Sequence, residues 1–480
     1  MVKNLVLCFE GTSEGFGIPP PSNVIKLFSM LDKSSQICYY QPGIGTTFGG
    51  AVPDIESRGA FHHHLDSAKN TVDAAFALSF DSHVQAAYLF LMRFWEPGAQ
   101  TYIFGFSRGG YAARVLTGFL ECFGLFHPGS EELVPMAWKV YREWEKAGRP
   151  KRDPNSSFSL QLQRMFGRDI RIHFLGVWDT VNSVGILTDR MFPFTICTAI
   201  VDHVRHAQSI DERRARFKHL SFENEVGECG SARPTVWGRL LGWLQSRSGQ
   251  IPVECSDNIL EVWFPGSHGD LGASAGFDEH GKRLSEVPFR WMVAEACKYG
   301  LKLDQNSVRA YWETNKPNDS ILSYHHDRLS FKKPILPSEK NINTFEGNLD
   351  RFNGRGNSSL LNTIGWWIVE LIPFSTRLPD ERGRWSSRFA PNLGQGRILP
   401  KSARLHWTVF FRLSVVSDYN PDNLPAELGK AFVESLRRAE ASIPEEKFSE
   451  LESFTLDDIR ESNLDHIWQQ VPDELATAEP

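Results

Sequence analysis

The sequence lacks the charge and cysteine patterns of several protein classes. Its 480 residues carry a formal net charge of -6, whereas nucleic-acid-binding proteins usually present a basic face. We therefore expect no nucleic-acid partner. The seven cysteines are dispersed singly, without a C-x-x-C pair or zinc-ligand spacing. A dispersed, odd set is typical of reduced core thiols, so the sequence predicts an intracellular, cytoplasmic protein without a bound metal.

Long apolar runs are also missing. No stretch approaches the roughly 18 consecutive apolar residues that favour a transmembrane helix. The apolar run at 5–9 is too short for a signal-peptide core, and residues 478–480 do not form a peroxisomal signal. We therefore expect neither a membrane-spanning helix nor a targeting segment. A glycine-rich loop at 42–50 lacks the lysine of a phosphate-binding loop, so the sequence predicts no nucleotide and no other cofactor.

The remaining composition is that of an ordinary globular protein, with 41% hydrophobic and 23% charged residues. Short apolar runs alternate with segments of helical periodicity. These runs lie at 2–9, 36–41, 101–106, 169–178 and 259–264. The alternation predicts an α/β fold with a mostly parallel sheet, helices on both faces, and cap or lid insertions.

The pattern also divides the chain. We expect a catalytic core over 1–300, with an insertion at about 186–258 in which 198–216 looks helical. Residues 301–480 are expected to form a cap and a C-terminal helical extension packed on that core. Two apolar segments, at 237–244 and 360–374, are expected either to line an acyl pocket or make peripheral membrane contact, or to be ordinary core helices.

The most informative stretch is 101–114, T-Y-I-F-G-F-S-R-G-G-Y-A-A-R. An apolar strand ends in G-F-S-R-G, and a helical segment follows. Glycines at 105 and 109 allow a tight reversal that exposes the Ser107 hydroxyl at the strand end. The pattern therefore favours a nucleophile elbow over a purely structural turn.

A serine nucleophile needs a base and an acid that orients the base. Asp179 directly follows one expected strand, and His268 lies just beyond another. The carboxyl ends of parallel strands meet at one edge of the sheet, which favours these two residues as acid and base. Taken singly, Asp179 is consistent with a helix cap and His268 with an ordinary surface histidine. Asp270 is a competing acid or, as we favour, a carboxylate that fixes the His268 loop.

The transition state of acyl transfer also needs two hydrogen-bond donors for its oxyanion. The backbone N–H of Arg108 is expected to supply one, and that of Gly11 or Thr12 the other. Glu10 is expected to orient this loop or to be a solvated strand end. A run of three histidines at 62–64 resembles a metal site, but adjacent residues cannot readily all bind one ion, so a solvated loop is the better interpretation.

Six strings in order resemble one family, the uncharacterised α/β-hydrolase domain family that includes phospholipase effectors of bacterial type VI secretion and many fungal proteins. They are L-C-F-E-G-T at 7–12, Y-Y-Q-P-G-I-G-T at 39–46, G-F-S-R-G-G-Y-A-A-R at 105–114, F-L-G-V-W-D-T-V at 174–181, D-E-R-R at 211–214 and E-V-W-F-P-G-S-H-G-D-L-G at 261–272. The resemblance covers about 1–300. It implies Ser107 as nucleophile, Asp179 as acid and His268 as base.

The expected function is a serine hydrolase that cleaves carboxylic esters, including lipid esters, through an acyl-enzyme intermediate. Its expected partner is a small-molecule or lipid ester. The alternatives are a thioesterase or peptidase, or a catalytically silent interaction protein on the same scaffold, because a fold does not guarantee an activity.

Overall fold

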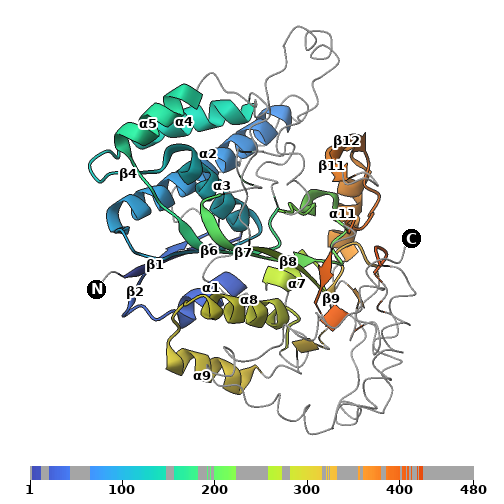
Figure 1. Ribbon diagram of the computed structural model, residues 1–480. Coiled ribbons are helices and arrows are strands. Elements are labelled where there is room, and N and C mark those ends of the chain that lie inside the picture. Colours follow the sequence, from blue (N-terminus) through green and yellow to red (C-terminus); the bar gives the residue numbers. More distant parts are fainter. Residues whose placement is uncertain are drawn as a thin grey trace, which may run out of the picture.

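The computed structural model describes most of the first 315 residues and parts of the remainder (Figure 1). The described residues are 3–11, 21–43, 65–146, 156–181, 192, 195, 199–222, 258–272, 282–315, 320–321, 323, 325–331, 355–356, 360–379, 385–399, 403–406, 408–409, 412, 419 and 421–424. The histidine run at 62–64, the apolar segment at 237–244 and the helical extension expected after 425 lie outside them.

A seven-stranded sheet forms the centre of the molecule, with the order β13-β8-β7-β6-β3-β1-β2. The strands are β1 (Asn4–Phe9), β2 (Gln36–Gln41), β3 (Thr101–Phe106), β6 (Ile172–Trp178), β7 (Val201–Ser209), β8 (Ile259–Phe264) and β13 (Arg404–Leu405). Every neighbouring pair is parallel. All these strands therefore end at the same edge, which is where parallel α/β sheets gather functional side chains.

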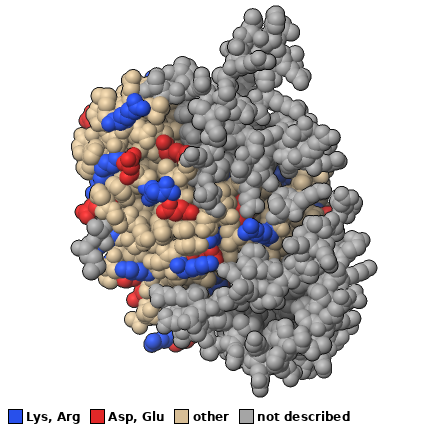
Figure 2. Space-filling view, viewed as in Figure 1, with Lys and Arg blue, Asp and Glu red and all other residues tan. Residues whose placement is uncertain are grey.

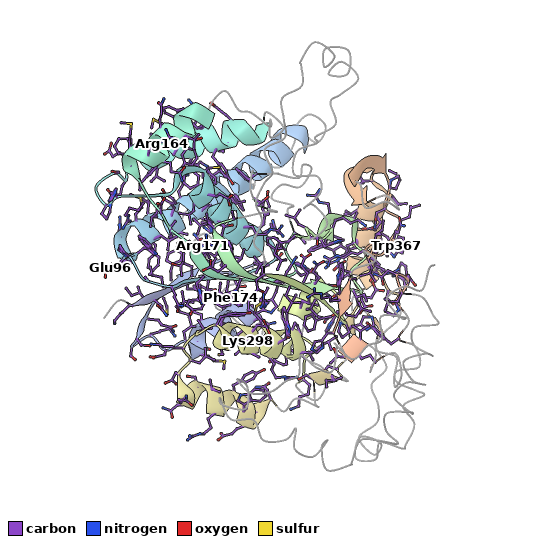
Figure 3. All side chains as sticks on the ribbon, in the orientation of Figure 1. Glu96, Arg164, Arg171, Phe174, Lys298 and Trp367 are labelled. Atoms are coloured by element: carbon purple, nitrogen blue, oxygen red, sulfur yellow. The ribbon has the colours of Figure 1, made fainter. Side chains whose placement is uncertain are left out.

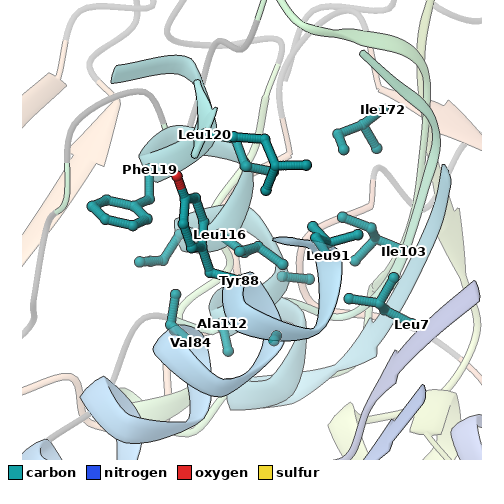
Figure 4. Packing of buried hydrophobic residues seen from close by; sticks show 14 of the residues in the cluster. Leu7, Val84, Tyr88, Leu91, Ile103, Ala112, Leu116, Phe119, Leu120 and Ile172 are labelled. Carbon is teal, nitrogen blue, oxygen red and sulfur yellow. The ribbon is translucent and has the colours of Figure 1, made fainter. Parts of the chain in front are cut away.

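One face of the sheet is covered by α2 (Leu65–Phe94), α3 (Ser107–Phe123), α4 (Leu133–Lys146) and α5 (Ser156–Phe166) (Figure 1). Figure 4 shows Tyr88 and Leu91 of α2 packed between α3 and strand side chains such as Ile103. Burial of this apolar layer supplies the main driving force for folding on that face. It also fixes α3, whose first residue is Ser107.

The opposite face is covered by α1 (Asn23–Met30), α8 (Glu286–Lys298) and α9 (Gln305–Thr314) (Figure 1). Ser22 caps α1 by accepting the N–H of Ile25. Asn23 donates to the carbonyls of Leu271 and Ser285. Helices thus lie on both faces of a parallel sheet, and the predicted α/β-hydrolase-like fold is confirmed.

The smaller elements lie mainly around the β8 end of the sheet. They are β4 (Leu125–Phe126), β5 (Gly167–Arg168), a 3₁₀ turn η1 (Ala215–Phe217), α7 (His268–Gly272), β9 (His325–His326), β10 (Arg355–Gly356), α11 (Leu360–Leu371), β11 (Phe374–Pro379) and β12 (Trp385–Ala390). Trp367 of α11 lies near that end in Figure 3, away from Phe174 in mid-sheet. The C-terminal region also supplies β13, which pairs with β8.

The prediction of a helix at 198–216 is wrong, because residues 201–209 form β7, an interior strand of the sheet. Its apolar residues Val201, Val204 and Ala207 recur every third position, which imitates a helical stripe. The intervening Arg205 and His206 are buried but paired with Glu295 and Glu261, respectively. Polar side chains paired in this way can occupy a buried strand. A core strand therefore lies within the segment predicted as an insertion.

The described part of the surface seen in Figure 2 carries interspersed Lys or Arg and Asp or Glu side chains. Among the described residues, no helix combines the length and apolar character needed to cross a bilayer.

Candidate active site

The turn between β3 and α3 has the geometry of a nucleophile elbow. Ser107 has φ of +57°, a conformation that non-glycine residues adopt only when the surroundings impose it. A Cβ on Gly105 would lie 2.7 Å from the Gly109 carbonyl oxygen, and one on Gly109 only 2.3 Å from the Glu10 carbonyl oxygen. The two glycines therefore let strand, turn and neighbouring loop approach closely, as the sequence pattern predicts.

Two other strand ends bring polar side chains to the elbow. Asp179 follows β6 directly and has φ of +40°, while His268 begins α7 after β8. A Cβ on Gly272, in the last position of α7, would lie 2.1 Å from the Phe106 ring. The absence of that side chain lets α7 pack directly on the strand that carries Ser107.

Ser107, His268 and Asp179 form a continuous hydrogen-bonded chain. Nε2 of His268 lies 2.8 Å from Oγ of Ser107, and Nδ1 lies 2.6 Å from Oδ2 of Asp179. The structure thus brings the three predicted residues together, although they are up to 161 positions apart in the chain. This arrangement suits proton transfer from a serine hydroxyl to an imidazole that a carboxylate orients.

The imidazole of His268 lies in an aromatic pocket. Phe106 stacks on it at 4.8 Å between ring centroids, and Phe217 lies at 4.7 Å. Burial lowers the pKa of His268 below its usual value, and the hydrogen bond that the imidazole donates to Asp179 opposes that shift. The imidazole is therefore neutral at pH 7, as a general base must be before the reaction.

The residues expected to bind an oxyanion lie near the elbow. Arg108 is the second residue of α3, so its N–H belongs to the first helical turn. Gly11 donates its N–H to the carboxyl group of Glu10 at 2.9 Å, whereas Thr12 lies outside the described residues. Among the described N–H groups, that of Arg108 therefore suits the role better than that of Gly11.

Glu10 is buried and not the solvated strand end that was one expectation. Its carboxyl group accepts hydrogen bonds from Ser22 at 2.5 Å and from Tyr40 at 3.3 Å. Burial raises its pKa to about 7, against the opposing effect of these hydrogen bonds. Glu10 therefore fastens the loop after β1 to α1 and β2, beside the elbow.

Two further carboxylates hold the loop that carries His268. Asp270 accepts the N–H of Ser267 at 2.9 Å and pairs with Nδ1 of His326 at 2.7 Å. Glu212 accepts the N–H of His268 at 3.2 Å and pairs with Arg214. Both ring nitrogens of His268 are engaged by Ser107 and Asp179, so the contacts of Asp270 match the loop-fixing role and not that of a competing acid.

Sequence reasoning did not find Arg397. Its guanidinium group contacts both carboxylate oxygens of Asp179, at 2.5 and 2.9 Å. Burial alone would raise the pKa of Asp179, but the charge of Arg397 and the hydrogen bond to His268 outweigh it and hold that pKa far below its usual range. The arginine lies in a glycine-containing loop without periodicity, so the sequence offers no signal for this contact.

Glu212 belongs to the D-E-R-R string, which is part of the family resemblance. The sequence suggested no function for its residues. The neighbouring Asp211 accepts the N–H of Gly266 at 2.6 Å, so this string holds the His268 loop from both sides. The described residues contain no cluster of histidine, cysteine and acidic side chains that could hold a metal ion.

Comparisons with known proteins point to one family. Residues 3–295 match the catalytic domain of the type VI secretion phospholipase effector family described as Tle1-like. The chain is also 32% identical to the uncharacterised protein YEL023C of Saccharomyces cerevisiae, over 90% of this chain and 82% of the yeast protein.

Two solved structures resemble the chain more distantly. An uncharacterised protein from Pseudomonas aeruginosa is 18% identical, covering 63% of this chain and 46% of its own, with a TM-score of 0.32. The Tle1 effector, solved bound to the VgrG spike of the type VI secretion system, is 16% identical, covering 56% of this chain and 51% of its own, with a TM-score of 0.28. The chain thus spans about half the length of these structures. Because the family match covers well over half of its residues, the chain belongs to the Tle1-like phospholipase effector family.

Proposed function

We propose that the protein is a serine hydrolase that cleaves carboxylic esters of lipids through an acyl-enzyme intermediate. The observation that carries this proposal is the hydrogen-bonded chain from Ser107 through His268 to Asp179, with contacts of 2.8 and 2.6 Å. Membership of a family of phospholipase effectors favours a lipid ester as the substrate. The side-chain geometry supports the serine mechanism.

In this mechanism His268 takes the hydroxyl proton of Ser107 through Nε2 as Oγ attacks the ester carbonyl carbon. The backbone N–H of Arg108 stabilises the resulting oxyanion. The imidazolium then donates its proton to the departing alkoxide, which leaves an acyl group on Ser107. Water, activated by the same imidazole, releases the acid and restores the serine. Asp179 orients the ring and stabilises the imidazolium in both halves.

The helix α11 supports a lipid substrate. Leu361, Ile364, Ile368 and Leu371 share one face of it and are between 43% and 81% exposed. On another face, the ring of Trp366 packs against that of Phe217, with 5.6 Å between the ring centroids, and Phe217 in turn contacts the His268 ring. An apolar face beside the site suits peripheral contact with a lipid surface.

A substrate comparison tests the proposal. The protein and its Ser107→Ala variant are incubated with phosphatidylcholine vesicles and with soluble p-nitrophenyl esters of increasing acyl length. We expect the wild-type protein to release fatty acid from vesicles, to prefer longer acyl chains, and to lose both activities in the variant. Equal rates for wild type and variant contradict the serine mechanism, and a preference for acetate with no release from vesicles contradicts the lipid substrate.

A further inference from the structure

The carboxylate of Asp179 is bound on all sides by fixed donors. Its Oδ1 accepts the N–H of Ser209 at 2.8 Å and one Arg397 nitrogen at 2.5 Å. Its Oδ2 accepts Nδ1 of His268 at 2.6 Å and the other Arg397 nitrogen at 2.9 Å. Arg397 thus supplies two of the four contacts and holds the carboxylate plane by a bidentate fork.

Arg397 is itself fully satisfied. Besides Asp179, its guanidinium donates to the carbonyl of Ser209 at 3.0 Å and twice to that of Phe217, at 2.6 and 3.1 Å. These contacts use the five donors of a guanidinium group, and the side chain is 1% exposed. Such a group cannot rotate without breaking several buried hydrogen bonds.

The backbone around Arg397 is tied to the catalytic edge from two directions. Asn423 donates to the carbonyls of Arg397 and Ile210, at 3.0 and 2.9 Å. Glu370 of α11 accepts the N–H of Gly394 at 3.0 Å and that of Ala215 at 2.6 Å. The loop therefore joins α11 to the chain that leaves β7.

From this geometry we propose that Arg397 is a positioning residue of the proposed hydrolase: it fixes the Asp179 carboxylate against His268, so that the region beyond the family's catalytic domain completes the active site. The proposal rests on the hydrolase function proposed above. It places an essential group about 100 residues beyond position 295, where the family match ends.

The charges around His268 explain why a cation is useful there. Two carboxylates, Asp179 and Glu212, are paired with two guanidinium groups, Arg397 and Arg214. These four side chains form a charged layer without net charge before the reaction. Beyond it, burial lowers the pKa of His206 and of His219, and His206 is paired with the carboxylate of Glu261.

A proton on His268 adds an uncompensated positive charge to that layer until a negative oxyanion develops beside Ser107. Arg397 thus adds to the effect of burial in keeping the resting imidazole neutral, while it keeps Asp179 ionised. Loss of the cation leaves one excess negative charge beside the ring. That charge stabilises the imidazolium and raises the pH below which the enzyme is inactive.

The test compares Arg397→Gln, Arg397→Lys and a matched control, Arg412→Gln. Arg412 is an equally buried arginine that donates to the carbonyls of Ile321 and Ser323. The measurements are kcat/KM for a soluble ester from pH 5 to 9, circular dichroism, and the pKa of His268 by NMR of protein labelled at histidine Cε1, with His268→Gln for assignment.

We expect Arg397→Gln to lower kcat/KM by about 10- to 100-fold at pH 8, and further at pH 6, because the acidic limb moves to higher pH together with the pKa of His268. Arg397→Lys keeps the charge but loses the fork, so kcat falls while the acidic limb stays near its wild-type position. In Arg412→Gln the acidic limb stays unchanged.

A folded Arg397→Gln protein with wild-type kcat/KM and an unchanged acidic limb overturns the proposal, as does a limb that moves equally in Arg397→Lys. If Arg397→Gln does not fold, Arg397→Lys decides. A folded lysine variant with wild-type kcat contradicts the positioning role, and a lowered kcat with an unmoved acidic limb supports it. A wild-type protein without any esterase activity overturns the proposed function instead, and the NMR measurement still tests the effect of Arg397 on His268.

Discussion

The region before residue 300 and the region after 360 contribute to the same site in different ways. The first carries the groups proposed to react, each at the end of a strand in a recognisable motif. The second carries Arg397, which holds the acid, and Trp366, which packs on Phe217 beside the base. Reactive groups can thus be encoded locally, while the electrostatic support arises only when distant segments meet.

Removal of the nucleophile gives the largest effect in this comparison. We expect Ser107→Ala to lower kcat by a factor on the order of 10⁴ or more, because general-base activation has no hydroxyl to act on. The free energy of unfolding is expected to change little, since alanine keeps the Cβ and therefore the strain of the φ of +57°. Steady-state kinetics and urea unfolding measure the two effects. Retention of more than a tenth of the activity contradicts the role of Ser107.

Asp179→Asn tests the point where the two regions meet. We expect kcat to fall by a factor on the order of 10⁴, because the amide no longer selects the correct tautomer of His268. The variant also leaves the buried Arg397 without its anion, which costs about 3 kcal/mol or more of the free energy of unfolding. A double variant, Asp179→Asn with Arg397→Gln, serves as the control and is expected to recover part of that stability. Additive losses contradict a direct coupling between these side chains.

A glycine exchange compares the elbow with α11. We expect Gly109→Ala to lower the free energy of unfolding by about 3 kcal/mol, because the new Cβ lies 2.3 Å from a carbonyl oxygen of the backbone. Gly365→Ala on α11 is the matched control. Nothing lies within 4 Å of a Cβ there, so the helix is expected to gain about 0.5–1 kcal/mol. Denaturant unfolding checks both, and equal effects of the two exchanges contradict close packing at the elbow.

Glu10 makes the free energy of unfolding depend on pH through the amino-terminal region. Its folded pKa of about 7 exceeds the ordinary value of 4.5. Between these two pH values Glu10 is therefore protonated in the folded state and ionised in the unfolded state. The stability contributed by Glu10 is therefore complete below pH 4.5 and is lost as the pH rises through 7, by up to about 3 kcal/mol. Glu10→Gln is expected to remove this loss. Urea unfolding at pH 5 and 8 checks it, and parallel pH profiles for the two proteins contradict it.

Substitutions on the exposed face of α11 are expected to have the smallest effect on hydrolysis. We expect the double variant Ile364→Ser, Ile368→Ser to lower hydrolysis of vesicle lipid by about tenfold while leaving soluble esters unaffected, because only the vesicle requires apolar contact. Vesicle co-sedimentation measures binding directly. An equal loss on both substrates indicates damage to the site and contradicts the surface role.

Local patterns account for what could be predicted. The strand ending at Phe106, the elbow at Ser107 and the strand ends before Asp179 and His268 follow from apolar runs and glycine spacing, which act over a few residues. The strand β7 could not be recognised, because Arg205 and His206 are buried against partners from elsewhere in the chain. Arg397 and its partner are 218 positions apart, and no periodicity records a contact of that kind.

Covalent labelling by a fluorophosphonate, followed by peptide mass spectrometry, tests the central claim most directly, because the reagent reacts with serines activated by an adjacent base. The account predicts one adduct on Ser107 in the wild-type protein, none in Ser107→Ala, and slow labelling of Asp179→Asn. A wild-type protein that stays unlabelled after detergent or lipid is added, or an adduct that persists in Ser107→Ala, contradicts it.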